Sequence, residues 1–133
     1  MRGYLITAVS AASLLVGQAH AHHSGAMFDP SKELKISGTI QEFVWTNPHS
    51  SFKVQVQNPS GMAETWAVEM SSPNNLVREG WKRTTLKVGD KVTVTIHPLR
   101  DGIPGGQYLS IILADGTQLG GEQKPETPGG PGN

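Results

Sequence analysis

The sequence predicts an all-β protein with one short helix, folded as a small five-stranded OB-type barrel. Short runs of alternating apolar and polar residues recur along the chain, and such period-two runs are typical of half-buried strands. A single helix signal falls between the third and fourth runs. The first run is long and its alternation breaks midway, as a strand that bends around a barrel requires. This order of elements matches an OB-type barrel, with a small β-sandwich as the alternative.

Residues 1–21 are expected to be a signal peptide that is cleaved from the folded protein. Arg2 precedes a short apolar stretch, and Ala19-His20-Ala21 has the small-x-small form of a signal-peptidase site. The apolar stretch is shorter than the roughly 20 residues that a spanning helix needs. We therefore expect a periplasmic or secreted protein that begins at His22 and makes no stable membrane insertion after cleavage.

The mature chain is expected to hold one domain between two short segments, because 133 residues are too few for two domains. A lead-in (residues 22–33) precedes the barrel domain (residues 34–119). The tail (residues 120–133) is rich in glycine and proline and too poor in apolar residues to fold, so we expect it to be disordered. The chain has no cysteine, which excludes a thiolate as nucleophile or metal ligand.

The first three strands are expected over residues 34–45, 51–57 and 63–70. Two consecutive polar residues, Gln41 and Glu42, break the alternation of the first strand and predict a bulge there. The turn between the second and third strands is predicted at 58–61, where asparagine, proline, serine and glycine follow one another.

The helix and the last two strands follow from capping and turn signals. Ser72 is a candidate N-cap, Pro73 suits the first helical position and Gly80 ends the segment, which predicts a helix of two turns. Trp81 is expected to cover the open end of the barrel. The fourth strand should bury alternate apolar residues, namely Val92, Val94 and Ile96. After a long glycine-rich loop, the fifth strand is expected over residues 108–114.

Four histidines of the mature chain are candidate metal ligands: His22, His23, His49 and His97. In an OB-type barrel, the loop between the first two strands and the loop between the last two flank the ligand-binding face. His49 lies in the first of these loops and His97 opens the second. The topology is therefore expected to bring both imidazoles to one face.

The histidine-led start of the mature chain indicates a metal site at the terminus. After signal cleavage, the free amine and Nδ1 of His22 can chelate one ion, and His23 adds another nitrogen nearby. Nitrogen-only ligation favours Cu(II), and imidazole also binds zinc and nickel. The sequence thus predicts a periplasmic or secreted metal-binding protein with copper as its cofactor and a metal ion as its main partner.

The alternative is a non-enzymatic OB-type module that binds a ligand or another periplasmic protein without metal. Its candidate ligand-binding residues are Trp45, Asn47 and Arg100. We expect a binding protein rather than an enzyme, because no nucleophile-elbow, zinc-protease or phosphate-loop motif is present. The formal charge is zero, so nucleic acid is not an expected partner.

Several segments of the mature chain together resemble a known protein family. In chain order they are His22-His23-Ser24, Met27-Phe28-Asp29, Gly38-Thr39, Trp45-Thr46-Asn47-Pro48-His49, Gly80-Trp81, Gly89-Asp90-Lys91-Val92, His97-Pro98 and Asp101-Gly102. This series resembles a family of small exported bacterial proteins named domain of unknown function 6152. The resemblance covers nearly all of the mature chain except the tail. It implies export and the extent of the domain, and it brings no activity to transfer.

Overall fold

The structure, a computed structural model, describes residues 25–121. The predicted signal peptide, His22, His23 and nearly all of the predicted tail lie outside the described residues. The elements are η1 (Gly25–Met27), β1 (Leu34–Val44), β2 (Ser51–Gln57), β3 (Ala63–Glu69), α1 (Pro73–Arg78), β4 (Lys91–Pro98), β5 (Gly105–Ile112) and β6 (Gln118–Gly120). Within the described range, no helix has the length and apolar character needed to cross a bilayer.

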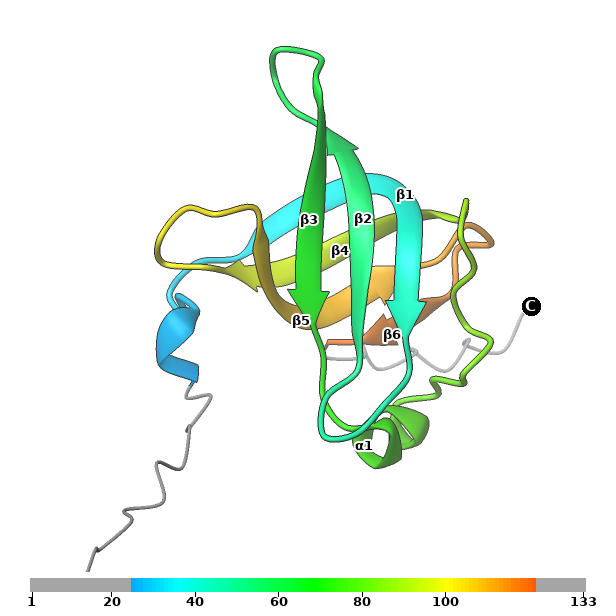
Figure 1. The fold of residues 1–133 in the computed structure, drawn as a ribbon. Helices are drawn as coiled ribbons and strands as arrows, with labels where there is room; N and C mark the ends of the chain where they lie inside the picture. The colour runs from blue at the N-terminus through cyan, green and yellow to red at the C-terminus, as the bar shows by residue number, and fades with distance from the viewer. Residues whose placement is uncertain (1–24, 122–133) are drawn as a thin grey trace, which may run out of the picture.

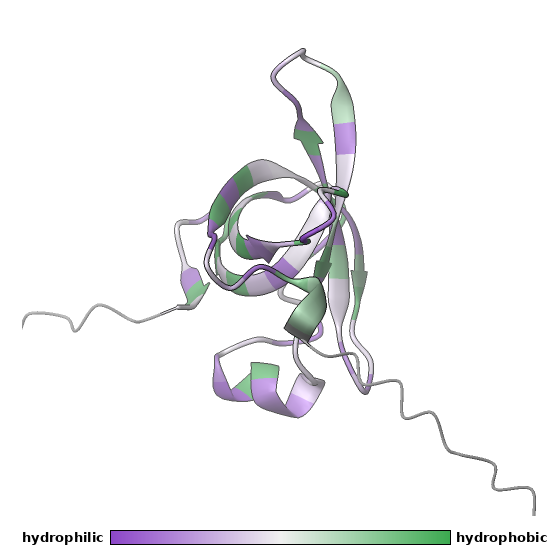
Figure 2. Ribbon diagram, turned by 90° about the vertical axis from the view of Figure 1, so that its left-hand side faces the viewer, coloured by the Kyte–Doolittle hydropathy of each residue, from purple (hydrophilic) through white to green (hydrophobic). Residues whose placement is uncertain are grey.

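The strands form a closed barrel of OB-like topology. The sheet order is β3-β2-β1-β4-β5-β6, and a parallel pairing of β3 with β5 closes the first five strands into a ring. The curving strands are visible in Figure 1, and Figure 2 shows the closed ring with α1 below it. The predicted all-β class with one short helix and a five-stranded barrel is therefore confirmed. The short β6, which pairs with β5, was not predicted.

β1 bends because two different strands pair with its two halves. Its first half pairs with β4 and its second half with β2, and the register with β2 shifts between Ile40 and Glu42. This shift is the bulge that the consecutive polar residues predict. Gly38 lies where the strands approach closely, since a Cβ there would meet the backbone carbonyl of Gln55. The first strand is thus long enough and curved enough to join both sides of the barrel.

α1 and Trp81 cover one end of the apolar core. The Ser72 side chain accepts a hydrogen bond from the Asn75 backbone N–H, which caps the helix as predicted, and Leu76 is fully buried. Trp81 is 1% exposed. Its ring centroid lies 6.0 Å from that of Phe43. The helix therefore lies at the same end of the barrel as the β1–β2 loop (Figure 1).

β5 begins at Gly105, three residues earlier than the predicted start at Tyr108. The glycines of this segment indicate a loop by composition, but here they serve the closure of the barrel. Gly105 pairs with Ala67 and Gly106 with Val68 across the β3–β5 seam. A Cβ at Gly106 would collide with the His97 carbonyl, so only glycine fits this close approach.

Replacing Gly106 with alanine is expected to lower the free energy of unfolding by about 1–3 kcal/mol through overpacking at the seam. Urea unfolding monitored by circular dichroism measures this change. Ser110→Ala, a truncation on the same strand at a partly exposed position, is the matched control and should change stability by less than about 0.5 kcal/mol. Equal midpoints for Gly106→Ala and the parent protein would show that the seam tolerates the added methyl group.

Candidate functional site

The β1–β2 loop is fastened to the end of β3 by Ser50, which is completely buried. The Ser50 hydroxyl accepts from the Thr46 backbone N–H at 3.3 Å and donates to the Thr46 carbonyl at 3.4 Å. Its backbone N–H donates to the Ser71 carbonyl at 3.0 Å, and its carbonyl accepts from the Met70 N–H at 2.9 Å. These bonds hold the preceding residue, His49, beside the end of β3.

His49 forms a close pair with Glu69. The distance from its Nδ1 to the Glu69 Oε1 is 2.8 Å, and the His49 side chain is 46% exposed. An ionised carboxylate only accepts hydrogen bonds, so the neutral imidazole donates from Nδ1 and keeps its lone pair on Nε2. A carboxylate behind the far ring nitrogen is the usual support of a metal-ligating histidine. The pair therefore leaves Nε2 of His49 in the state that binds a metal ion.

His97 is likewise bonded through Nδ1, which lies 2.8 Å from the Lys32 carbonyl oxygen. A carbonyl is an acceptor, so this imidazole also keeps its lone pair on Nε2. His97 pairs with Gln107, and Gln107 pairs with Glu69 across the barrel seam. The Cα atoms of His97 and Glu69 are therefore two strand spacings apart, about 10 Å. The structure thus places His97 near the end of β4 and His49 in the β1–β2 loop, beside Glu69 of β3.

The lead-in is docked against the β4–β5 loop. The Arg100 N–H donates to the Met27 carbonyl at 3.0 Å, and the Asp29 N–H donates to the Pro98 carbonyl at 2.9 Å. Phe28 forms a β-bridge with Leu99 and is 7% exposed. These contacts hold residues 27–29 of the lead-in against the end of β4 and the loop that follows it.

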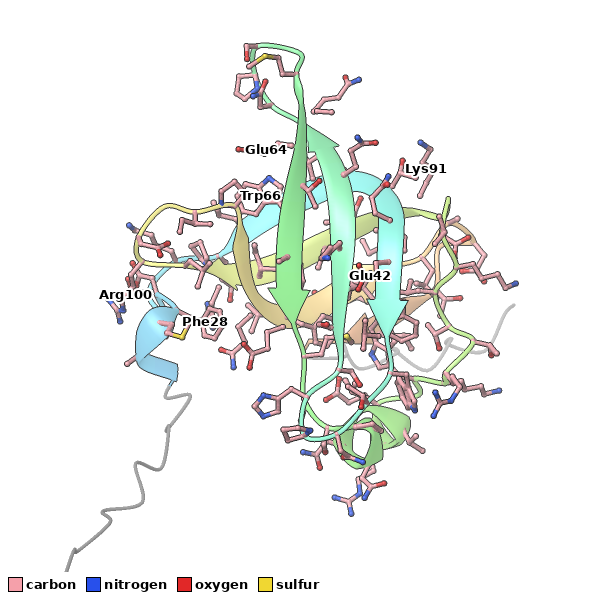
Figure 3. The ribbon with its side chains drawn as sticks, viewed as in Figure 1. Phe28, Glu42, Glu64, Trp66, Lys91 and Arg100 are labelled. Carbon is pink, nitrogen blue, oxygen red and sulfur yellow. The ribbon has the colours of Figure 1, made fainter. Side chains whose placement is uncertain are left out.

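The predicted ligand-binding residues make contacts within the protein. The Arg100 Nε donates to the Ala26 carbonyl at 3.1 Å, and Figure 3 shows Arg100 and Phe28 beside η1. Trp45 is half-buried, with its ring edge-to-face against Phe43 at 5.9 Å. Asn47 is exposed in the β1–β2 loop, where its peptide bond to Pro48 is cis. The structure thus places Trp45 and Asn47 in the β1–β2 loop and Arg100 in the β4–β5 loop.

A groove of about 550 Å³, here called the His49 groove, opens between the β1–β2 loop, α1 and β5. This volume is within the usual range for small-ligand pockets. The lining residues that bear on its chemistry are Phe28, His49, Glu69, Glu79, Gln107 and Tyr108. His97, Trp45, Asn47 and Arg100 do not line it. Among the predicted site residues that the structure describes, His49 is the member that faces this groove.

The described residues alone do not assemble a complete metal site. Within residues 25–121, no three side chains of histidine, cysteine, aspartate or glutamate are grouped so that they could hold an ion. A metal ion at Nε2 of His49 would need further ligands from outside this range. His22 and His23, the other predicted ligands, lie there, so the predicted shared site stays a prediction.

Glu69 and Ser50 are the site residues that the sequence reasoning missed. Both carry a signal in the register of the β2–β3 hairpin. The turn after Gln57 sets the register of β2 against β3. Counted back from this turn, Ser51 pairs with Glu69, as in the structure. His49 stands two residues before Ser51, so continuing this count places it opposite Ser71 and makes Glu69 its diagonal neighbour.

Comparisons with known proteins identify a family and list two similar solved structures. The model of a family described as "Family of unknown function (DUF6152)" matches residues 9–108. No curated protein matches the chain. A crystal structure of Rim1, a mitochondrial single-stranded DNA binding protein from S. cerevisiae, aligns with a TM-score of 0.48 and 14% identity, covering 68% of this chain and 96% of that one. A second structure of Rim1, from selenomethionine-labelled protein, aligns with a TM-score of 0.45 and 14% identity, covering 62% and 94%.

These structures correct one expectation drawn from the composition. The formal charge of zero led us to exclude nucleic acid as a partner. The solved proteins that align with this chain are themselves described as single-stranded DNA binding proteins, and the exclusion, which rested on formal charge alone, is withdrawn. Formal charge sums over the whole chain and says little about how one face of a barrel is charged.

Proposed function

This chain belongs to the DUF6152 family, whose function is unknown, and we propose that it is an exported Cu(II)-binding protein. The ligands are the amine and imidazole of a processed His22, the imidazole of His23, and Nε2 of His49. The observation that carries the proposal is the 2.8 Å contact between His49 Nδ1 and the Glu69 carboxylate. It fixes the tautomer that ligates through Nε2 and orients the ring.

The docking of the lead-in supports the contribution of the N-terminal histidines. Phe28 lines the same groove as His49. His23 precedes Phe28 by five residues, which span at most about 17 Å when fully extended. The terminal chelate can therefore reach the mouth of the groove without any rearrangement of the barrel.

The donor set favours copper among the divalent metals. It consists of nitrogen ligands, without a thiolate, because the chain has no cysteine. Such a set suits the tetragonal geometry of Cu(II), which also binds most strongly in the divalent series; zinc and nickel are the competing ions. Export to the periplasm or beyond follows from the signal-peptide pattern. Mass spectrometry of the exported protein tests this directly, since the proposal requires a mature chain that starts at His22.

Substitutions at the His49–Glu69 pair test the metal site. We expect Glu69→Gln to weaken Cu(II) binding about 10–100-fold, because the amide supports the His49 ring less well than the carboxylate. His49→Ala should weaken it at least as much. Calorimetric titration of the mature, untagged protein measures both. His97→Ala is the comparison variant. If His97→Ala weakens Cu(II) binding as much as His49→Ala does, the copper site includes β4. If His49→Ala binds Cu(II) like the parent protein, the His49 groove is not part of the copper site.

The second candidate is a non-enzymatic OB-type module that binds a small ligand or a partner protein without metal. The volume of the His49 groove favours it, since all of the lining residues lie within the described part of the chain and none is an N-terminal histidine. Elemental analysis of the native, untagged protein separates the two candidates. Stoichiometric copper supports the first, and protein free of metal at neutral pH supports the second.

A further inference from the structure

The His49 groove is walled by parts of the chain that lie far apart in sequence. Phe28 comes from the lead-in, Glu69 from β3, Glu79 from the end of α1 and Tyr108 from β5. Two aromatic residues and two glutamates therefore line one concave surface. Such a mixture of apolar walls and a few polar groups is typical of a site for a small organic ligand.

The charge of the groove selects for a cation. Glu69 and Glu79 line it, and its lining residues, all within the described part of the chain, include neither lysine nor arginine. The His49 imidazole is already bonded to Glu69. No ion pair joins the Glu79 carboxylate to another residue of the described range. A positively charged group in the groove would thus gain an attraction that the protein itself does not supply.

Two features of the wall suit an ammonium group on an organic body. The Tyr108 hydroxyl accepts a hydrogen bond from Trp81 Nε1 at 3.1 Å, which fixes the ring and leaves its second lone pair available to a donor. Burial raises the pKa of Tyr108, so this hydroxyl stays neutral. Aromatic rings such as Phe28 and Tyr108 also attract cations over their faces.

Glu79 is the residue that a bound ammonium group would stabilise most. Partial burial raises the pKa of its carboxyl group, so a positive charge placed beside it would stabilise the ionised form. An ammonium ion beside this carboxylate supplies both positive charge and N–H donors.

We propose that the His49 groove binds a small organic ammonium ion, with its charge at Glu79 and its alkyl body against Phe28 and Tyr108. This inference rests on the second candidate function, the OB-type module that binds a ligand without metal. It states which class of ligand that module would bind. It stands or fails separately from the Cu(II) proposal, because neither Glu79 nor Tyr108 is a proposed metal ligand.

Calorimetry on the mature protein, stripped of metal with a chelator, tests the proposal with three probes of equal chain length. They are 1,4-diaminobutane, the neutral 1,4-butanediol and the dianion succinate. We expect the diamine to bind at least about tenfold more tightly than the diol, and succinate not to bind. Equal binding of diamine and diol, or no binding of the diamine at millimolar concentration, would overturn the proposal.

Glu79→Gln is expected to weaken diamine binding at least about tenfold, since it removes one charge and keeps the side-chain shape. Glu42→Gln is the matched control: Glu42 is on β1, pairs with Lys53 and does not line the groove, so binding should stay unchanged. Urea unfolding of both variants confirms that the barrel is intact. Diamine binding that survives Glu79→Gln, or that falls equally in Glu42→Gln, would show nonspecific attraction to the acidic surface and would refute the site.

Discussion

Replacing Trp81 with alanine is expected to lower the free energy of unfolding by about 3–5 kcal/mol, as large-to-small substitutions of buried aromatic residues do. Trp81 is almost fully buried, and its ring packs edge-on against Tyr108 with centroids 5.4 Å apart. The substitution opens a cavity under α1. It also removes the Nε1 donor from the Tyr108 hydroxyl, leaving a partly buried oxygen with less hydrogen bonding.

Urea unfolding followed by far-UV circular dichroism measures this loss without relying on tryptophan fluorescence. Trp45→Ala is the control, because Trp45 is half-buried at the edge of the same aromatic group and should cost markedly less. Closely similar losses in the two variants would contradict the role of Trp81 as the residue that closes this end of the core.

Adding one serine before His22 of the mature chain is expected to weaken Cu(II) binding about 100-fold, or about 2.8 kcal/mol. The extension turns the terminal amine of His22 into an amide and breaks the chelate ring that the amine forms with Nδ1. It leaves the barrel, His49 and Glu69 unchanged, so the loss reports on the terminus alone. Competition titration against a chelator of known affinity gives the ratio.

The matched control for this extension is a serine added after Asn133, at the opposite end of the chain. This variant has the same composition as the extended one and should bind Cu(II) like the parent protein. If both variants bind equally well, the terminal chelate has no part in the site.

The elements set by local patterns were predictable from the sequence. β2 was predicted with its observed bounds, and the bulge in β1 lies at the predicted break between Ile40 and Glu42. Ser72 caps α1, as its position before Pro73 indicates. These features depend on neighbouring residues, whose side-chain alternation and capping chemistry can be read directly.

The features that depend on distant parts of the chain were not predictable in the same way. The start of β5 at Gly105 follows from the closeness of the β3 backbone, which composition alone does not reveal. Topology predicts that the β1–β2 and β4–β5 loops flank one face, yet in Figure 1 the β1–β2 loop lies beside α1 and the β4–β5 loop projects from another side of the barrel. The distance between His49 and His97, however, depends on how many strands separate them, and Glu69 joins His49 only through the register of β2 with β3.

Pulsed electron paramagnetic resonance of the mature protein, loaded with less than one equivalent of Cu(II), tests the copper site most directly. In this experiment, the ring nitrogen of each bound imidazole that does not contact copper modulates the electron spin echo. The depth of this modulation gives the number of bound imidazoles. In a His49 imidazole bound through Nε2, the remote nitrogen is the Nδ1 that faces Glu69. Our account predicts that His49→Ala removes the modulation of one imidazole and leaves that of the N-terminal histidines. Identical spectra from the parent protein and His49→Ala would contradict it.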